Sequence, residues 1–152
     1  MLMNFLIGLP TMVLCLFLQA VLLIAAIRYY SHRESVLESP SFLSSLAVLS
    51  SVMLLLVIGN LAQMAIWGLL FEVLGEFKQF GEAFYHSAVN FATLGYGDIV
   101  MSAEHKLLGP LEAINGVLMI GVSTAALMTA FQDAMHRTIR ARQAKRSSSW
   151  RS

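Results

Sequence analysis

The sequence predicts an all-α integral membrane protein with three transmembrane helices and one short re-entrant helix. Hydrophobic residues make up 57% of the 152-residue chain and charged residues only 12%, and the mean hydropathy is +0.70. Soluble domains carry about 25% charged residues, so this composition leaves too few polar side chains to cover a surface in water. Three apolar stretches each reach the length of about 20 residues that a helix needs to cross a bilayer.

The first apolar segment lies within residues 1–30 and has no charged side chain from Met1 to Ile27. A cleaved signal peptide is the alternative, but the segment has no basic start and no clear cleavage site, and its apolar run is too long. We therefore expect a retained helix. Proline suits a first helical turn, so Pro10 is a candidate start, with Met1–Leu9 as an optional extension. Gln19 predicts a buried hydrogen bond between helices.

The second span is expected from about Leu43 to Leu70. Ser39-Pro40 suits the N-cap and first turn of a helix at this point. Asn60 and Gln63 share one helix face, which we expect to pack against protein rather than lipid. Trp67, near the end of the span, fits an interfacial aromatic belt.

The third span is expected over residues 107–132, followed by a basic tail at 133–152. Lys and Arg near helix ends favour the cytoplasmic side. They occur after the first helix, at Arg28 and Arg33, and again in the tail. Three crossings put both regions on one side, so we expect a multi-pass protein of the plasma or inner membrane with an external N-terminus and a cytoplasmic C-terminus. The tail is also a candidate for binding anionic lipid, with simple retention of positive charge inside as the alternative.

A short stretch lies between the last two spans. Residues 81–92 are too few to cross a bilayer, and Thr93-Leu94-Gly95-Tyr96-Gly97-Asp98 follows them. Irregular backbone at membrane depth is stable only where protein or a water-filled cavity surrounds it. A dehydrated cation is a suitable partner for its carbonyl groups, and glycine allows conformations in which these groups align. The partly negative C-terminal end of helix 81–92 also favours a cation.

This hexapeptide, placed between a short helix and a final span, resembles the selectivity filter of the tetrameric potassium-channel pore family. The resemblance covers about Leu43 to Phe131 and implies a homotetramer around one axis. It divides the chain into an extra N-terminal helix (1–30), a cytoplasmic loop (31–42), a pore domain (43–132) and the basic tail (133–152). Within the pore domain it implies an outer helix, a pore helix (81–92), a filter (93–98) and an inner helix (107–132).

The resemblance also implies which residues bind the ion. Potassium ions would be coordinated by backbone carbonyls of Thr93, Leu94, Gly95 and Tyr96, with the Thr93 hydroxyl at the innermost site and Gly97 at the outer mouth. Leu94 replaces the commoner valine, and selectivity should survive because its carbonyl coordinates the ion.

Asp98 would brace the filter from behind. Tyr85 and His86 occupy the positions of the family's aromatic pair, and Val89 stands where some members have a glutamate. Since valine cannot donate, we expect Tyr85 to donate a hydrogen bond to Asp98 within one subunit, with His86 as the alternative donor. For His86 itself, a packed neutral side chain is favoured over a pH sensor.

The inner helix contains further candidates. Gly121 is either a gating hinge, as the resemblance implies, or a site of close helix packing. Ser123, Thr124 and Thr129 are candidates for the wall of a water-filled cavity. Glu112 and Asn115 should face protein, since an acid in a membrane helix needs a partner, and we expect a structural hydrogen bond behind the filter.

The resulting hypothesis is a passive potassium-selective channel rather than an enzyme, with K⁺ ions in the filter, no organic cofactor and no nucleic-acid partner. A weakly selective cation channel and a non-conducting regulatory or scaffolding subunit are the alternatives. No span carries arginine at every third position, so we expect no voltage sensor. We also expect no cytoplasmic ligand-binding domain, and a peripheral position for the extra helix.

Overall fold

The computed structural model describes residues 1–36 and 42–149, and this part of the chain is helical with connecting loops. Its elements are α1 (Leu2–Val36), α2 (Phe42–Val73), α3 (Phe80–Phe91) and α4 (Leu108–Ser149). Three of these helices are long and apolar enough to cross a membrane, over Leu2–Tyr29, Leu46–Val73 and Leu108–His136. The predicted all-α class with three spans is confirmed.

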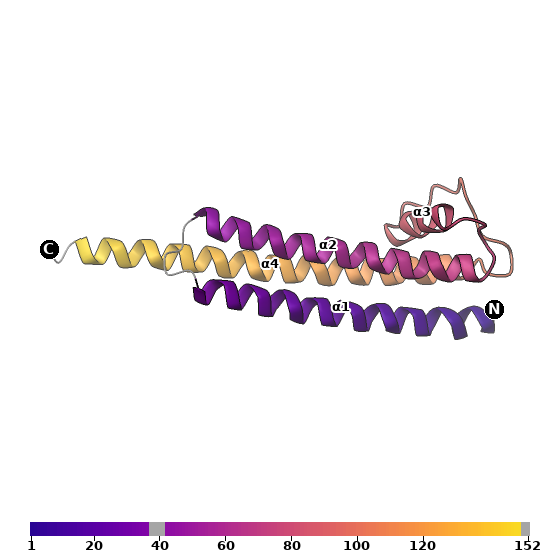
Figure 1. Ribbon diagram of the computed structural model, residues 1–152, viewed down its shortest axis with the longest axis horizontal. Coiled ribbons are helices and arrows are strands. Elements are labelled where there is room, and N and C mark those ends of the chain that lie inside the picture. Colours follow the sequence, from indigo (N-terminus) through magenta and orange to yellow (C-terminus); the bar gives the residue numbers. More distant parts are fainter. Residues whose placement is uncertain (37–41, 150–152) are drawn as a thin grey trace.

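The three long helices lie side by side, and α3 lies at the end of the bundle where the chain begins (Figure 1). The C-terminal end of α4 extends from the opposite end of the bundle. The end of α1, with its basic residues, lies at that same opposite end. This is the arrangement expected for three crossings with both basic regions on one side.

The predicted starts of α1 and α2 can be compared with the structure at one of the two positions. Pro10 does not begin α1, because the helix already runs from Leu2 and includes the proline. Proline is tolerated inside transmembrane helices. Next to it, the Thr11 hydroxyl donates a hydrogen bond to the Ile7 carbonyl of its own helix, at 3.0 Å. The proposed cap at Ser39-Pro40 lies outside the described residues.

A chain of polar side chains joins the three long helices in the middle of the bundle. Gln63 of α2 donates to Gln19 of α1 at 2.7 Å, and Gln19 donates to Ser123 of α4 at 2.8 Å. All three side chains are buried. The predictions for Gln19 and for the face of Gln63 are confirmed. Such bonds matter in lipid, where apolar burial no longer drives helices together, and each is worth about 1 kcal/mol.

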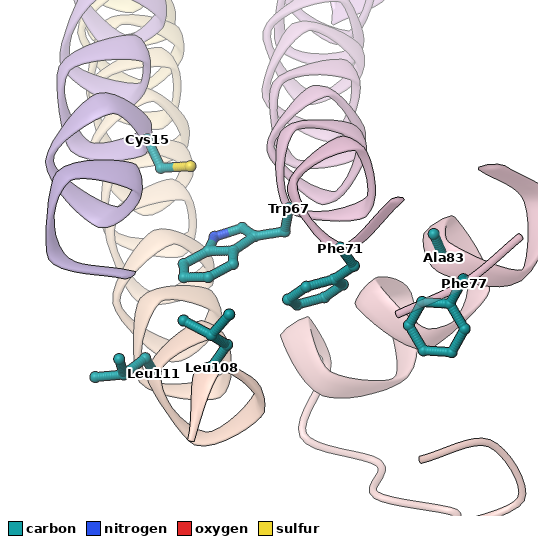
Figure 2. Close-up of a cluster of buried hydrophobic side chains, with 7 residues drawn as sticks. All are labelled: Cys15, Trp67, Phe71, Phe77, Ala83, Leu108 and Leu111. Atoms are coloured by element: carbon teal, nitrogen blue, oxygen red, sulfur yellow. The ribbon is translucent and has the colours of Figure 1, made fainter. Parts of the chain in front are cut away.

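An apolar core fills the end of the bundle that carries α3 (Figure 2). Trp67 is fully buried in it and packs against Phe71, with ring centroids 5.9 Å apart. The expectation that Trp67 belongs to an interfacial belt is therefore wrong. An indole can serve as a packing residue wherever helices converge, and position near the end of a span does not reveal which way the ring points. The buried members of this core are Cys15, Trp67, Phe71, Phe77, Ala83, Leu108 and Leu111.

Candidate functional site: the loop after the short helix

The backbone after α3 alternates in conformation. Thr93, Gly95 and Gly97 have φ values of +58°, +58° and +72°, and Thr93 is the one non-glycine residue with positive φ in the described part of the chain. The left-handed region is costly for a β-branched residue, and such outliers cluster at functional sites. Positive φ at every second residue from Thr93 to Gly97 means that the backbone changes hand along this segment. A segment with this alternation can present its carbonyls on one side, which is the geometry that a carbonyl-lined filter needs.

The entry to this segment is fixed by the end of α3. The amide of Thr93 donates to the Asn90 carbonyl at 2.8 Å, and the amide of Leu94 donates to the Val89 carbonyl at 2.9 Å. All residues from Thr93 to Asp98 are nevertheless exposed in one subunit. Leu94 and Tyr96 are 54% and 65% exposed, as are many apolar side chains on the outer faces of the spanning helices.

Tyr85 on α3 reaches across to the end of the segment. Its hydroxyl donates a hydrogen bond to Asp98 Oδ2 at 2.7 Å, which confirms the predicted bond. This bond lowers the pKa of the Asp98 carboxyl below its usual value and raises the pKa of the Tyr85 phenol. Asp98 is therefore held as a carboxylate that ties the end of the segment to α3.

His86, next along α3, anchors the chain just after Asp98. Its Nδ1 lies 3.0 Å from the Ile99 carbonyl, which can only accept, so Nδ1 carries the proton. Its Nε2 is then free to accept from the Asn90 amide at 2.9 Å. The ring also packs against Phe71 and Phe77, and burial lowers its pKa. These contacts agree with a packed neutral histidine rather than a pH sensor.

The opposite face of α3 is pressed against the long helices. A Cβ built on Gly116 of α4 would lie 2.0 Å from the Phe91 carbonyl oxygen, so only glycine fits there. Ser87 lies between α2 and α4, hydrogen-bonded to the Met64 carbonyl at 2.7 Å and to the buried Glu112 carboxyl. The expectation that Glu112 makes a structural hydrogen bond behind residues 93–98 is thus confirmed by its contact with Ser87 of α3. The sequence pattern did not single out Gly116, because a glycine in an apolar helix has no signature of its own.

A second set of contacts holds the outer loops. Glu76, in the loop after α2, accepts hydrogen bonds from the Ser102 amide and hydroxyl at 2.6 Å each, and lies 2.5 Å from His105 Nδ1. Burial opposes its charge, yet the bonds from Ser102 and His105 keep the pKa of Glu76 below its usual value. Sequence reasoning missed this cluster, because its members lie 26 and 29 positions apart and nothing in their spacing links them.

The candidates on α4 lie in different environments. Gly121 is exposed and has nothing within 4 Å of a built Cβ, so no close packing occurs there within one subunit. Thr124 and Thr129 are exposed and bond to carbonyls of their own helix. Ser123 instead points to Gln19 of α1 and is buried. The expectation that Ser123 lines a water-filled cavity is therefore wrong for this subunit. The side chain instead accepts the hydrogen bond of Gln19, a buried amide that needs an acceptor in lipid.

Thr129 also lines a largely apolar groove of about 590 Å³ between α1, α2 and α4. In the described part of the chain, no three His, Cys, Asp or Glu side chains are grouped so that they could hold a metal ion.

A comparison with protein families gives one match. A family model described as "Ion channel", of the potassium-channel type with two transmembrane helices, covers residues 52–133, slightly more than half of the chain. The match includes α3, the segment after it and most of α2 and of the transmembrane part of α4. Neither a search of curated proteins nor one of solved structures gave a significant match.

Proposed function

The chain belongs to the ion-channel family whose model it matches, and we propose that it forms a potassium-selective channel of four identical subunits. Ion-channel activity and a multi-pass membrane location follow from the family and from three apolar helices. The identity of the ion, the number of subunits and the orientation of the chain in the membrane are the parts that we propose.

One observation carries the choice of ion: the alternation of positive φ at Thr93, Gly95 and Gly97. Four such segments around an axis would present rings of carbonyl oxygens at successive heights. These rings would replace the water shell of K⁺, at the carbonyls of Thr93, Leu94, Gly95 and Tyr96, with the Thr93 hydroxyl at the inner end. The C-terminal end of α3, with its partly negative dipole, adds to the attraction for a cation.

The exposure of the segment supports assembly. Backbone at membrane depth has to be satisfied by protein or by water in a cavity, and one subunit leaves Thr93 to Asp98 uncovered. Neighbouring copies would cover Leu94 and Tyr96 and leave the carbonyls facing the axis. Transport through such a pore is passive, so it needs no catalysed reaction and no organic cofactor.

The α3 end of the bundle would face outward and the basic end the cytoplasm, in a plasma or inner membrane. Cysteine substitutions test this orientation. An impermeant thiol reagent added to intact cells should label Ala103→Cys and spare Ile139→Cys, both of which alter exposed residues outside the spans. The reverse labelling would overturn it.

The decisive experiment uses the purified chain in liposomes with a K⁺ gradient. Flux of K⁺ well above that of Na⁺ is the expected result. Equal fluxes would favour the weakly selective cation channel, and the absence of flux from correctly folded oligomers would favour a non-conducting subunit. Empty liposomes and liposomes with a filter variant serve as controls.

A further inference from the structure

A group of polar side chains is buried where the three long helices meet, and one of them, Glu112, is hydrogen-bonded to Ser87 of α3. Trp67 of α2 and Glu112 and Asn115 of α4 are all 0% exposed. Cys15 of α1 is equally buried and lies beside the Asn115 amide and the Trp67 indole, with the Glu112 carboxyl near it. In Figure 2, Cys15 and Trp67 extend toward each other from facing helices, and the indole nitrogen is on the side of the ring nearer to the thiol.

These side chains have more hydrogen-bonding atoms than partners. Trp67 Nε1, Glu112 Oε2 and both polar atoms of the Asn115 amide have no partner in normal hydrogen-bond geometry. The Cys15 thiol is the nearby group for the indole and the Asn115 amide, and the Asn90 amide is the nearby group for Glu112. Glu112 and Asn115 are one helical turn apart and therefore share a face of α4. Buried polar atoms are nearly always hydrogen-bonded to protein or to ordered water, because leaving one unpaired costs the whole desolvation penalty. Several such atoms around one place indicate a missing partner.

The kinds of atom define the partner. The Trp67 indole can only donate, the Asn115 amide both donates and accepts, and Glu112 Oε2 supplies an oxygen. A metal cation would need acceptors alone and would be repelled by the indole N–H. An apolar ligand would leave every one of these atoms unpaired. Water both donates and accepts, and buried water typically makes about three hydrogen bonds to such groups.

We propose that each subunit holds ordered water in this interior site, bonded to Trp67, Asn115 and Glu112. The water links α2 to α4 next to Cys15 of α1. The other oxygen of Glu112 contacts Ser87, so the bonded network continues into α3. The site rests on side chains within one chain and does not depend on the ion that the protein conducts.

The indole N–H of Trp67 provides a direct probe. The chain has two tryptophans, so Trp150→Phe leaves Trp67 as the single indole signal in ¹⁵N-labelled protein in detergent or lipid. We expect a cross-peak between the indole proton and water, even though the ring is fully buried. Absence of this cross-peak in the folded protein would overturn the proposal, and this measurement requires no substitution in the interior.

Further substitutions in the Trp150→Phe protein distinguish water from other hydrogen-bond partners of the Trp67 indole. Asn115→Leu should weaken the cross-peak several-fold, whereas Thr124→Val, an exposed control on the same helix, should leave it unchanged. Cys15→Ala tests the thiol as a direct partner of the indole. The water site predicts that the cross-peak persists in this variant; an indole signal without water contact that shifts on removal of the sulfur would contradict the proposal.

Discussion

Gly97 has a backbone conformation that a side chain would strain. Its φ is +72°, and the left-handed region costs about 1–2 kcal/mol for most residues with a side chain. In a tetramer that strain would be present four times at the outer mouth. We expect Gly97→Asp to abolish K⁺ flux into liposomes or to remove the preference for K⁺ over Na⁺. Gly81→Asp is the matched control, because Gly81 has no positive φ and open space around it. A Gly97→Asp protein that discriminates as well as the parent would refute the assigned filter.

The hydrogen bond between Tyr85 and Asp98 should be detectable in the titration of the Asp98 carboxyl. Because the hydrogen bond from Tyr85 lowers the pKa of Asp98, the carboxylate stabilises the folded state above the pKa of an unfolded aspartate. This contribution is lost as the pH falls through the lower folded pKa. Tyr85→Phe removes the donor, so the pKa of Asp98 should rise and the acid-induced loss of flux should begin at a higher pH. Open-pore lifetimes should also shorten several-fold. Carboxyl NMR titration and single-channel recording give the two readouts; an unchanged Asp98 titration would argue against the bond.

At the scale of elements, Glu76 fastens the loop after α2 to the segment before α4. Its lowered pKa means that it adds stability above about pH 4.3, the value for an unfolded glutamate, and that this is lost as the pH falls through the folded pKa. Glu76→Gln should lower the free energy of unfolding at neutral pH by about 1.5–3 kcal/mol, the range for hydrogen bonds to a charged group. Thermal unfolding in detergent at pH 7 and at pH 3 measures both effects. Glu104→Gln, at an exposed position nearby, should change neither, and equal effects of the two variants would contradict this role.

The attachment of α1 depends on Gln19, which bonds to both Gln63 and Ser123. Gln19→Leu should lower the thermal stability of the purified protein by about 1 kcal/mol or slightly more, the usual range for bonds between membrane helices. K⁺ flux should persist, since Gln19 does not touch the segment after α3. Gln132→Leu changes an exposed glutamine of α4 and provides the control. If Gln19→Leu is as stable as this control, the bridge contributes nothing measurable.

The sequence located some elements much better than it located side chains. The bounds of α3 agree with the predicted 81–92 to within one residue, because a short helix before the glycine-containing segment has clear limits. Polar residues such as Gln19 and Glu112 also marked buried faces correctly, since they are costly in lipid. Trp67 and Ser123 were misplaced. In a soluble protein the apolar stripe of a helix reveals its buried face, but in lipid all faces are apolar and only the partner helices decide which way such a residue points.

At the scale of the whole molecule, one subunit leaves the proposed filter uncovered. Its most exposed functional segment carries Tyr96, at 65% exposure, beside Leu94 at 54%. A neighbouring copy that covers these side chains would also remove the segment from lipid, where unpaired backbone is not tolerated. Native mass measurement in mild detergent should therefore give four times the chain mass of 16.7 kDa.

Tyr96→Ala tests whether that contact drives assembly. Removing the ring should shift the population from tetramer toward smaller species, because an aromatic side chain contributes a large buried area to an interface. Val73→Ala alters another exposed apolar residue, at the end of α2, and should leave the tetramer intact. A parent protein that is a stable monomer or dimer under these conditions would count against a shared pore. A tetramer that is equally stable in both variants would mean that the subunits meet elsewhere, and the exposure of Tyr96 would then need another explanation.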